Sequence, residues 1–220
     1  MINKILFTSY MCDIKDNIIQ IILHEWRKKN PTFKIIYFSD NDIQLFFKDT
    51  PYEKTYKKLK NGVAIADFFR ICYIYTHGGY WFDIDLEPFS VNIPEKGNIH
   101  LFDCGYKNIS YMFIGGIKNK LFEDVIKEVT IRINKNVKHK TQHIMDITGP
   151  RIIQDIVFKK LKIINKDGNF PGHTVSQTHL EHTDYEFEYL LQNIKNTKTQ
   201  IYKILQNKYK KLPYQYYNYI

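Results

Sequence analysis

Cysteine is scarce in this chain and shows no spacing pattern. Only Cys12, Cys72 and Cys104 occur among 220 residues, and none of them forms a CxxC pair. An odd number without a framework excludes a disulfide-stapled secreted fold and argues against a cysteine-based zinc site. We therefore expect free thiols in a reducing compartment, with Cys72 as an ordinary core residue.

Long apolar stretches are also missing. No segment approaches the roughly 18 consecutive apolar residues that a membrane span needs. The apolar start of the chain is too short for a signal peptide and lacks a small-residue cleavage site. These absences predict a cytoplasmic protein. At 220 residues and 44% hydrophobic composition, the chain suits one packed domain.

Acidic residues are absent from Tyr189 to Ile220, where six lysines and several tyrosines occur, and the whole chain carries a net charge of +9. A solvated helix with a loose end explains such a tail. Contact with an anionic lipid surface, a nucleic acid or a polyanionic acceptor would also explain it. No nucleic-acid-binding motif accompanies the charge, so we do not expect that partner, whereas a peripheral membrane contact through the tail stays open.

Apolar periodicity predicts alternating strands and helices in the first 50 residues. Short runs rich in β-branched residues predict strands over 2–9 and 33–38, and helical spacing predicts helices over 13–30 and 39–47. Such alternation favours a parallel sheet covered by helices.

The remainder continues this pattern, and we expect one catalytic domain over 1–185 with a basic, Tyr-rich helix and tail over 186–220. The elements predicted here are helices at 63–77, 121–133 and 186–209, a helix opening at 148–150, strands at 80–86 and 111–114, and a loop at 165–185.

Two carboxylates, Asp83 and Asp85, stand on the apolar strand predicted at 80–86. Strand side chains alternate, so both share a face with Trp81, while Tyr80, Phe82, Ile84 and Leu86 take the other face. Adjacent carboxylates repel each other, and a divalent cation removes that repulsion. Oxygen ligands favour Mg²⁺ or Mn²⁺, which can bridge the phosphates of a leaving diphosphate. On its own, however, Asp-x-Asp also fits solvated surface acids.

An Asp/Arg pair lies just upstream on the predicted helix 63–77. Asp67 and Arg70 are three residues apart and therefore share a helix face. They could form a simple surface salt bridge. Alternatively, Asp67 accepts hydrogen bonds from ribose hydroxyls while Arg70 holds Asp67 or reaches a phosphate. Gly78-Gly79 ends the helix and brings it beside the acidic strand.

The segments Ala66 to Arg70 and Gly78 to Asp85 together resemble the donor-site signature of glycosyltransferase family 32. That family includes yeast-type mannosyltransferases and bacterial and viral glycan enzymes, and the clostridial glucosylating toxins carry a similar signature. The resemblance implies a GT-A fold, an α/β domain with a Rossmann-like, mostly parallel sheet flanked by helices. Tyr80 and Trp81 could stack on a sugar, but beside a double glycine they are more simply core residues.

The resemblance also assigns roles to the acidic signature. It implies that Asp85 ligates the metal most directly and that Asp83 contacts the ribose or sugar and the outer shell of the metal, which makes both catalytic. Asp67 would bind ribose or sugar hydroxyls with Arg70 supporting it. The opening strand is similar to one that ends at the nucleotide base, which implies that Thr8, Ser9 and Tyr10 lie near that base.

Late in the chain the resemblance is weaker. Thr148-Gly149-Pro150 matches a family Thr-Gly-Pro, and a His-rich loop holds His173, His179 and His182 but lacks the tryptophan that family members carry after it. The resemblance implies a late metal ligand, for which His182 is our first candidate and His179 the second.

The function implied by the resemblance is metal-dependent glycosyl transfer. A UDP- or GDP-sugar would donate its sugar, with retention of configuration and with Mn²⁺ or Mg²⁺ bound, to a hydroxyl of an unknown glycan or protein acceptor in glycan biosynthesis. The alternative is a catalytically inactive module that binds a nucleotide sugar or glycan.

Overall fold

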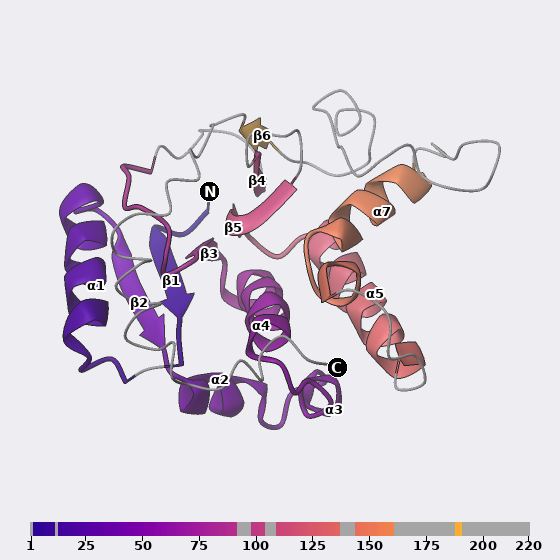
Figure 1. Cartoon of the computed structure of the whole chain (residues 1–220). Helices are drawn as coiled ribbons and strands as arrows, with labels where there is room; N and C mark the ends of the chain where they lie inside the picture. Colours follow the sequence, from indigo (N-terminus) through magenta and orange to yellow (C-terminus); the bar gives the residue numbers. More distant parts are fainter. Residues whose placement is uncertain are drawn as a thin grey trace.

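A six-stranded sheet runs through the molecule in the order β2-β1-β3-β5-β4-β6 (Figure 1). The structure is a computed structural model, and it describes residues 2–11, 13–91, 98–103, 109–136, 144–160 and 188–190. The strands are β1 Ile5–Ser9, β2 Lys34–Phe38, β3 Gly79–Phe82, β4 Ile99–Asp103, β5 Ile109–Gly116 and β6 Glu188–Leu190.

Parallel pairings outnumber antiparallel ones by three to two. β1 pairs in parallel with β2 and β3, and β4 pairs in parallel with β6. β5 is antiparallel to both of its neighbours, β3 and β4. The predicted α/β class is confirmed, with a mixed sheet that is parallel over β2-β1-β3 at one side and over β4-β6 at the other.

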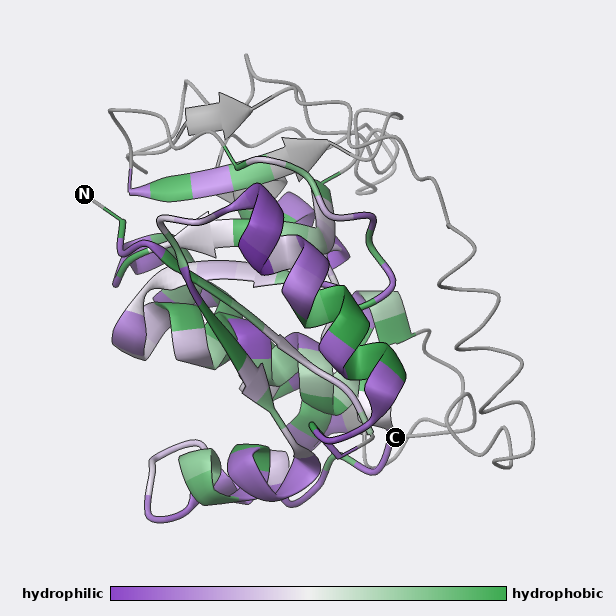
Figure 2. Cartoon of the chain, turned by 90° about the vertical axis from the view of Figure 1, so that its left-hand side faces the viewer, coloured by the Kyte–Doolittle hydropathy of each residue, from purple (hydrophilic) through white to green (hydrophobic). Residues whose placement is uncertain are grey.

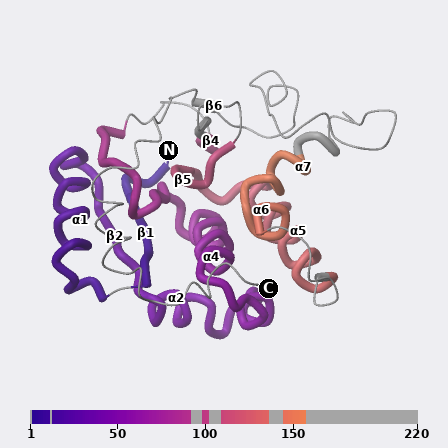
Figure 3. The backbone as a smooth tube through the Cα atoms, viewed as in Figure 1, coloured from indigo at the N-terminus to yellow at the C-terminus, as the bar shows by residue number. Residues whose placement is uncertain are grey.

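Helices cover both faces of this sheet. They are α1 Asn17–Lys29, α2 Asp40–Phe47, α3 Glu53–Tyr56, α4 Gly62–His77, α5 Lys120–Asn136, α6 Ile144–Ile147 and α7 Arg151–Lys160. Figure 3 shows α1 on one side of the sheet and the group α4, α5, α6 and α7 on the other. Hydrophobic and hydrophilic residues interchange along the covering helices, as expected for amphipathic elements (Figure 2).

The alternation of side chains along β3 separates two hydrophobic cores. Tyr80 and Phe82 pack on the α1 side, where the ring centroids of Trp26 and Phe82 lie 4.2 Å apart. Trp81 belongs to the core on the α4 side and contacts the ring of Phe69 edge-on. Tyr80, Phe82, Ile84 and Leu86 share one core, so this part of the face prediction is confirmed.

Local sequence explains how α4 begins and ends. The Asn61 side chain accepts hydrogen bonds from the N–H groups of Val63 and Ala64, which caps the helix. Gly78 and Gly79 follow with φ angles of 72° and 112°, which residues with a side chain rarely adopt. A Cβ on Gly79 would also lie 3.0 Å from the Ile5 carbonyl oxygen. The double glycine therefore lets β3 start directly against β1.

The strand predicted at 80–86 is wrong in its second half. β3 ends at Phe82, and residues 83–86 form a turn in which the Leu86 N–H donates to the Asp83 carbonyl at 2.9 Å. Asp83 and Asp85 therefore do not share a strand face. The turn forms because the Asp83 N–H makes its last sheet-like bond, to the Met112 carbonyl at 2.8 Å, and pairing with β5 then stops.

Other elements were missed or lie outside the described residues. Nothing in the sequence pattern predicted α3 or β4. The helix predicted at 186–209 is wrong over 188–190, which form β6 because they pair with β4 at the edge of the sheet. The loop predicted at 165–185, the remainder of that helix, Cys12 and Cys104 lie outside the described residues.

The tail predicted over 186–220 includes β6. Residues 188–190 therefore pair in the same sheet as the strands of the domain predicted over 1–185.

Cys72 is a buried free thiol, as predicted, and burial raises its pKa. Among the described residues, no helix is both long and apolar enough to cross a bilayer.

Candidate active site

The carboxyl ends of β1, β2 and β3 meet at one edge of the sheet because these strands are parallel. Ser9 pairs with Phe38, and Phe7 pairs with Trp81. When the β1–β3 register is extended two residues beyond Phe7 and Trp81, Ser9 lies level with Asp83. Ligands of open α/β sheets bind outside the carboxyl ends of such strands. The acidic turn at 83–86 therefore lies at the edge where a ligand site is expected.

The acidic turn keeps both carboxylates partly accessible. Asp83 and Asp85 are half-buried, whereas Ile84 and Leu86 between and after them are buried in the α1-side core. The buried pair fixes the turn to the sheet. Both aspartates thus reach the surface from a rigid base, even though they do not stand on a strand.

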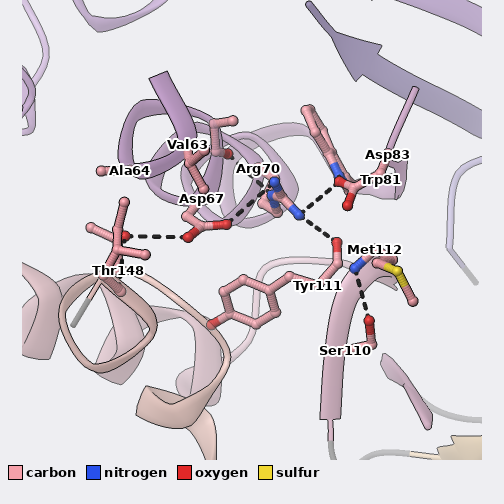
Figure 4. A network of polar contacts seen from close by, with 12 residues as sticks. Val63, Ala64, Asp67, Arg70, Trp81, Asp83, Ser110, Tyr111, Met112 and Thr148 are labelled. Carbon is pink, nitrogen blue, oxygen red and sulfur yellow. Dashed lines mark hydrogen bonds and ion pairs between the residues drawn. The ribbon is translucent and has the colours of Figure 1, made fainter. Parts of the chain in front are cut away.

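Arg70 lies behind this turn, buried between two carboxylates (Figure 4). Its Nη1 donates to Asp83 Oδ1 at 3.0 Å and to the carbonyl of Tyr111, and its Nη2 forms an ion pair with Asp67 Oδ1 at 3.3 Å. Its Nε donates to the Ala66 carbonyl at 3.2 Å. All three guanidinium nitrogens therefore have a protein partner. Of the two uses considered from the sequence, holding Asp67 describes this geometry and reaching a phosphate does not.

Trp81 holds the same oxygen of Asp83. Its indole N–H donates to Asp83 Oδ1 at 2.7 Å, and the guanidinium carbon of Arg70 lies 4.3 Å from the centroid of its ring. Trp81 is almost fully buried, as the core interpretation predicted. Two donors therefore occupy Oδ1, and neither of them bonds the second carboxylate oxygen, Oδ2.

Asp67 is the most buried acid of the signature, with 5% of its surface exposed. Thr148 Oγ donates to its Oδ2 at 3.2 Å, while Arg70 pairs with its Oδ1. Burial raises the pKa of Asp67 to about 6; the Asp83 charge adds to this rise, and Arg70 and the Thr148 hydroxyl oppose it. The carboxylate is thus ionised at neutral pH mainly because Arg70 and Thr148 compensate its loss of water.

The raised pKa of Asp67 predicts a pH-dependent stability. The folded protein binds this proton more tightly than the unfolded chain, so the free energy of unfolding falls as pH rises from about 4 to about 6. We expect a fall of about 2 to 3 kcal/mol from this one group. Urea unfolding of the wild type and of Asp67→Asn at a series of pH values measures this fall. The quantity to follow is the difference between the unfolding free energies of the two proteins at each pH.

Because other carboxylates titrate equally in both proteins, their contributions cancel in that difference. A difference that stays flat between pH 4 and 6 would contradict the assignment. Glu123→Gln serves as the control, since Glu123 is a partly exposed helix residue paired with lysines at the surface of α5.

Two contributors to this site were not predicted as site residues. Tyr111 provides the carbonyl that Arg70 binds, and its own buried hydroxyl has no hydrogen-bond partner among the described residues. Burial raises its pKa. Thr148 was noted only as part of a motif match, which was the one available signal. No local pattern marked Tyr111.

The residues predicted to lie near a nucleotide base stand at the end of β1. Thr8 is completely buried, and its hydroxyl has no partner within the described part of the chain. Ser9 and Tyr10 are partly exposed, and the Tyr37 hydroxyl donates to the Tyr10 carbonyl at 2.9 Å. Ser9 and Tyr10 thus reach the same edge as the acidic turn, and their contact with a base stays a prediction.

The donor set at this edge fits a hard divalent cation. Asp83 and Asp85 offer carboxylate oxygens, the ligand type that Mg²⁺ and Mn²⁺ prefer. Within the described residues, no group of three or more histidine, cysteine, aspartate or glutamate side chains converges on a point. His182 and His179 lie outside those residues, as does His173. Phosphate oxygens of a ligand and water would complete such a coordination sphere.

This architecture is an α/β domain of the GT-A type, with an acidic turn at the carboxyl edge of its parallel strands. Residues 17–94 match the family described as "Glycosyltransferase sugar-binding region containing DXD motif". The match confirms the resemblance over that segment, which includes all four of Asp67, Arg70, Asp83 and Asp85.

A solved structure titled "PaToxG Glycosyltransferase" has the same fold. The two chains are 14% identical with a TM-score of 0.54, over 82% of this chain and 83% of that one. No curated protein matches the chain. The family match and the shared fold support glycosyl transfer in general.

Proposed function

We propose that this protein is a metal-dependent glycosyltransferase that moves a sugar from a UDP- or GDP-sugar to an acceptor hydroxyl. One observation carries the proposal: Arg70 is buried between Asp67 and Asp83 and fixes the latter beside Asp85 at the ligand edge of the sheet. Burial of a cation between two acids costs free energy because all three charges lose water. Binding of a metal and its anionic ligand at the acidic turn would explain why this arrangement is kept.

Each residue of the site would have a separate role. Asp85 and the Oδ2 atom of Asp83 would hold Mn²⁺ or Mg²⁺, which when bound neutralises the charge of the departing diphosphate. Ser9 and Tyr10 stand where the nucleoside would lie. Asp67 would contribute by orienting Arg70 and, through it, Asp83. A position for His182 as a further ligand stays part of the proposal.

Retention of configuration is the stereochemical course that we propose. Asp67 is buried and paired on both oxygens, so it is not placed to attack a sugar carbon. A front-face course suits such a site, because the leaving diphosphate oxygen itself assists the incoming hydroxyl. The protein then contributes position and charge stabilisation rather than a covalent step.

Turnover of a donor tests the proposed function. With Mn²⁺ and a panel of UDP- and GDP-sugars, we expect slow release of free nucleoside diphosphate from one donor even without an acceptor. EDTA should abolish the release, and Glu123→Gln should retain it. Binding of a donor without release, whatever glycan or protein acceptor is added, would instead identify an inactive binding module. If the protein neither binds nor turns over any donor, that result would contradict both the transferase and the inactive binding module.

The cellular context is proposed more coarsely. The predicted cytoplasmic location, the role in glycan biosynthesis and the membrane contact of the Lys/Tyr-rich tail stay parts of the proposal, and most of that tail lies outside the described residues. Binding of the whole protein to vesicles with and without anionic lipid would test the tail contact.

A further inference from the structure

Thr148 connects the outer helical layer to the acidic site. Its side chain and that of Asp67 are both buried, and its Oγ lies 3.2 Å from Asp67 Oδ2 across 81 positions of sequence. The same hydroxyl also lies 3.4 Å from the Ile144 carbonyl. A hydroxyl has one hydrogen to donate, and the charged acceptor at the shorter distance forms the stronger bond.

The turn that carries Thr148 is held firmly in place. Arg132 of α5 donates to the carbonyl of Asp146 in α6, which directly precedes the turn, and to Asp155 Oδ2 of α7 at 2.7 Å. A Cβ on Gly149 would lie 2.7 Å from the Cα of Met145, so only glycine lets the turn close so tightly. The position of the Thr148 hydroxyl is therefore fixed by α5 and α7 rather than by the site itself.

From Thr148 an unbroken polar chain leads to the ligand edge, and Figure 4 shows its members side by side. Asp67 pairs with Arg70 at 3.3 Å, Arg70 donates to Asp83 Oδ1 at 3.0 Å, and Trp81 donates to that same oxygen at 2.7 Å. The Asp83 side chain is 28% exposed, against 6% for those of Asp67 and Arg70. The chain therefore meets the ligand edge at Asp83.

We propose that Thr148 is a positioning residue of the donor site, which acts through Asp67 and Arg70 to fix the orientation of the Asp83 carboxylate. The identity of the ligand rests on the proposed function, whereas the coupling itself does not. Without the hydroxyl, the Asp67 carboxylate is free to turn, Arg70 follows its counter-ion, and the hold on Asp83 Oδ1 changes. The threonine of the Thr-Gly-Pro motif thus acquires a role at a distance.

The two tryptophans of the chain allow a direct test by ¹⁵N–¹H NMR of their indole N–H groups. Trp81 donates to Asp83, while the buried indole N–H of Trp26 has no hydrogen-bond partner among the described residues and lies in the other core. Thr148→Val removes the hydroxyl at nearly constant volume, and Thr148→Ser keeps it. We expect Thr148→Val to move the Trp81 signal by more than its linewidth and leave that of Trp26 in place, and Thr148→Ser to move neither.

An unmoved Trp81 signal in folded Thr148→Val would overturn the proposal, and so would equal movement of both signals, which indicates a general rearrangement. If Thr148→Val does not fold, Asp67→Asn breaks the chain at its next link and should move the same signal.

In turnover, we expect Thr148→Val to raise the donor KM by about 2- to 10-fold, the range that one hydrogen bond supplies, with a smaller change in kcat. Thr148→Ser should restore the KM. A wild type without turnover would contradict the proposed function and leave the NMR result to decide the coupling.

Discussion

Replacement of Arg70 with methionine is expected to cost about 3 to 5 kcal/mol of unfolding free energy, the largest stability effect of any site substitution. Methionine fills much of the volume but leaves Asp67 and Asp83 without their shared cation and the Tyr111 carbonyl without its donor. Urea unfolding at neutral pH measures the loss. The part of this loss that comes from Asp67 should shrink as pH falls toward about 6 and then level off. Without Arg70 the pKa of Asp67 is higher still, so Asp67 loses its charge in the variant first and is protonated in both proteins at lower pH.

Two further variants separate charge from geometry. Arg70→Lys keeps the charge, but a single nitrogen cannot reach both Asp67 and Asp83, so we expect an intermediate loss. Arg151→Met is the matched control, because Arg151 pairs with Asp146 at a partly exposed position, where such pairs contribute about 1 kcal/mol or less. A loss in Arg70→Met no larger than in Arg151→Met would contradict the central position given to Arg70.

The sequence predicted those parts of the site that depend on local spacing. Asp67 and Arg70 meet because they stand three residues apart on one helix, and the double glycine turns the chain directly into β3. The placement of Tyr80 and Trp81 in the two opposite cores followed in the same way from strand geometry. These features are set within a few residues, so a pattern in the chain is enough to see them.

Features that depend on distant partners were not predictable in the same way. The strand ends at Phe82 because pairing with β5 stops there, which nothing in 80–86 indicates. β6 forms because β4 offers an open edge, although its own residues fit a helical pattern. Thr148 reaches Asp67 only because α5 and α7 fix its turn. In each case the deciding contact joins residues that are far apart in sequence.

Substitution of Asp85 by asparagine is expected to lower metal-dependent turnover by on the order of 100-fold or more, in line with the loss of one preorganised group that stabilises developing charge. Asp85 is partly exposed in a turn whose fixed points are its buried neighbours, so the unfolding free energy should change by only about 0.5 kcal/mol. Initial rates of nucleoside diphosphate release at several Mn²⁺ concentrations measure the first effect, and urea unfolding measures the second.

Asp83→Asn should differ from Asp85→Asn in a way that only this geometry explains. Asp83 accepts from both Arg70 and Trp81, so its replacement should lower turnover and also destabilise the fold, by about 1 to 3 kcal/mol, because Arg70 loses a charged partner. Glu87→Gln, at the exposed residue two positions beyond Asp85, should retain both properties. Equal destabilisation by Asp83→Asn and Asp85→Asn would mean that Arg70 does not distinguish the two acids. Undiminished turnover in Asp85→Asn would remove the acidic turn from the metal site.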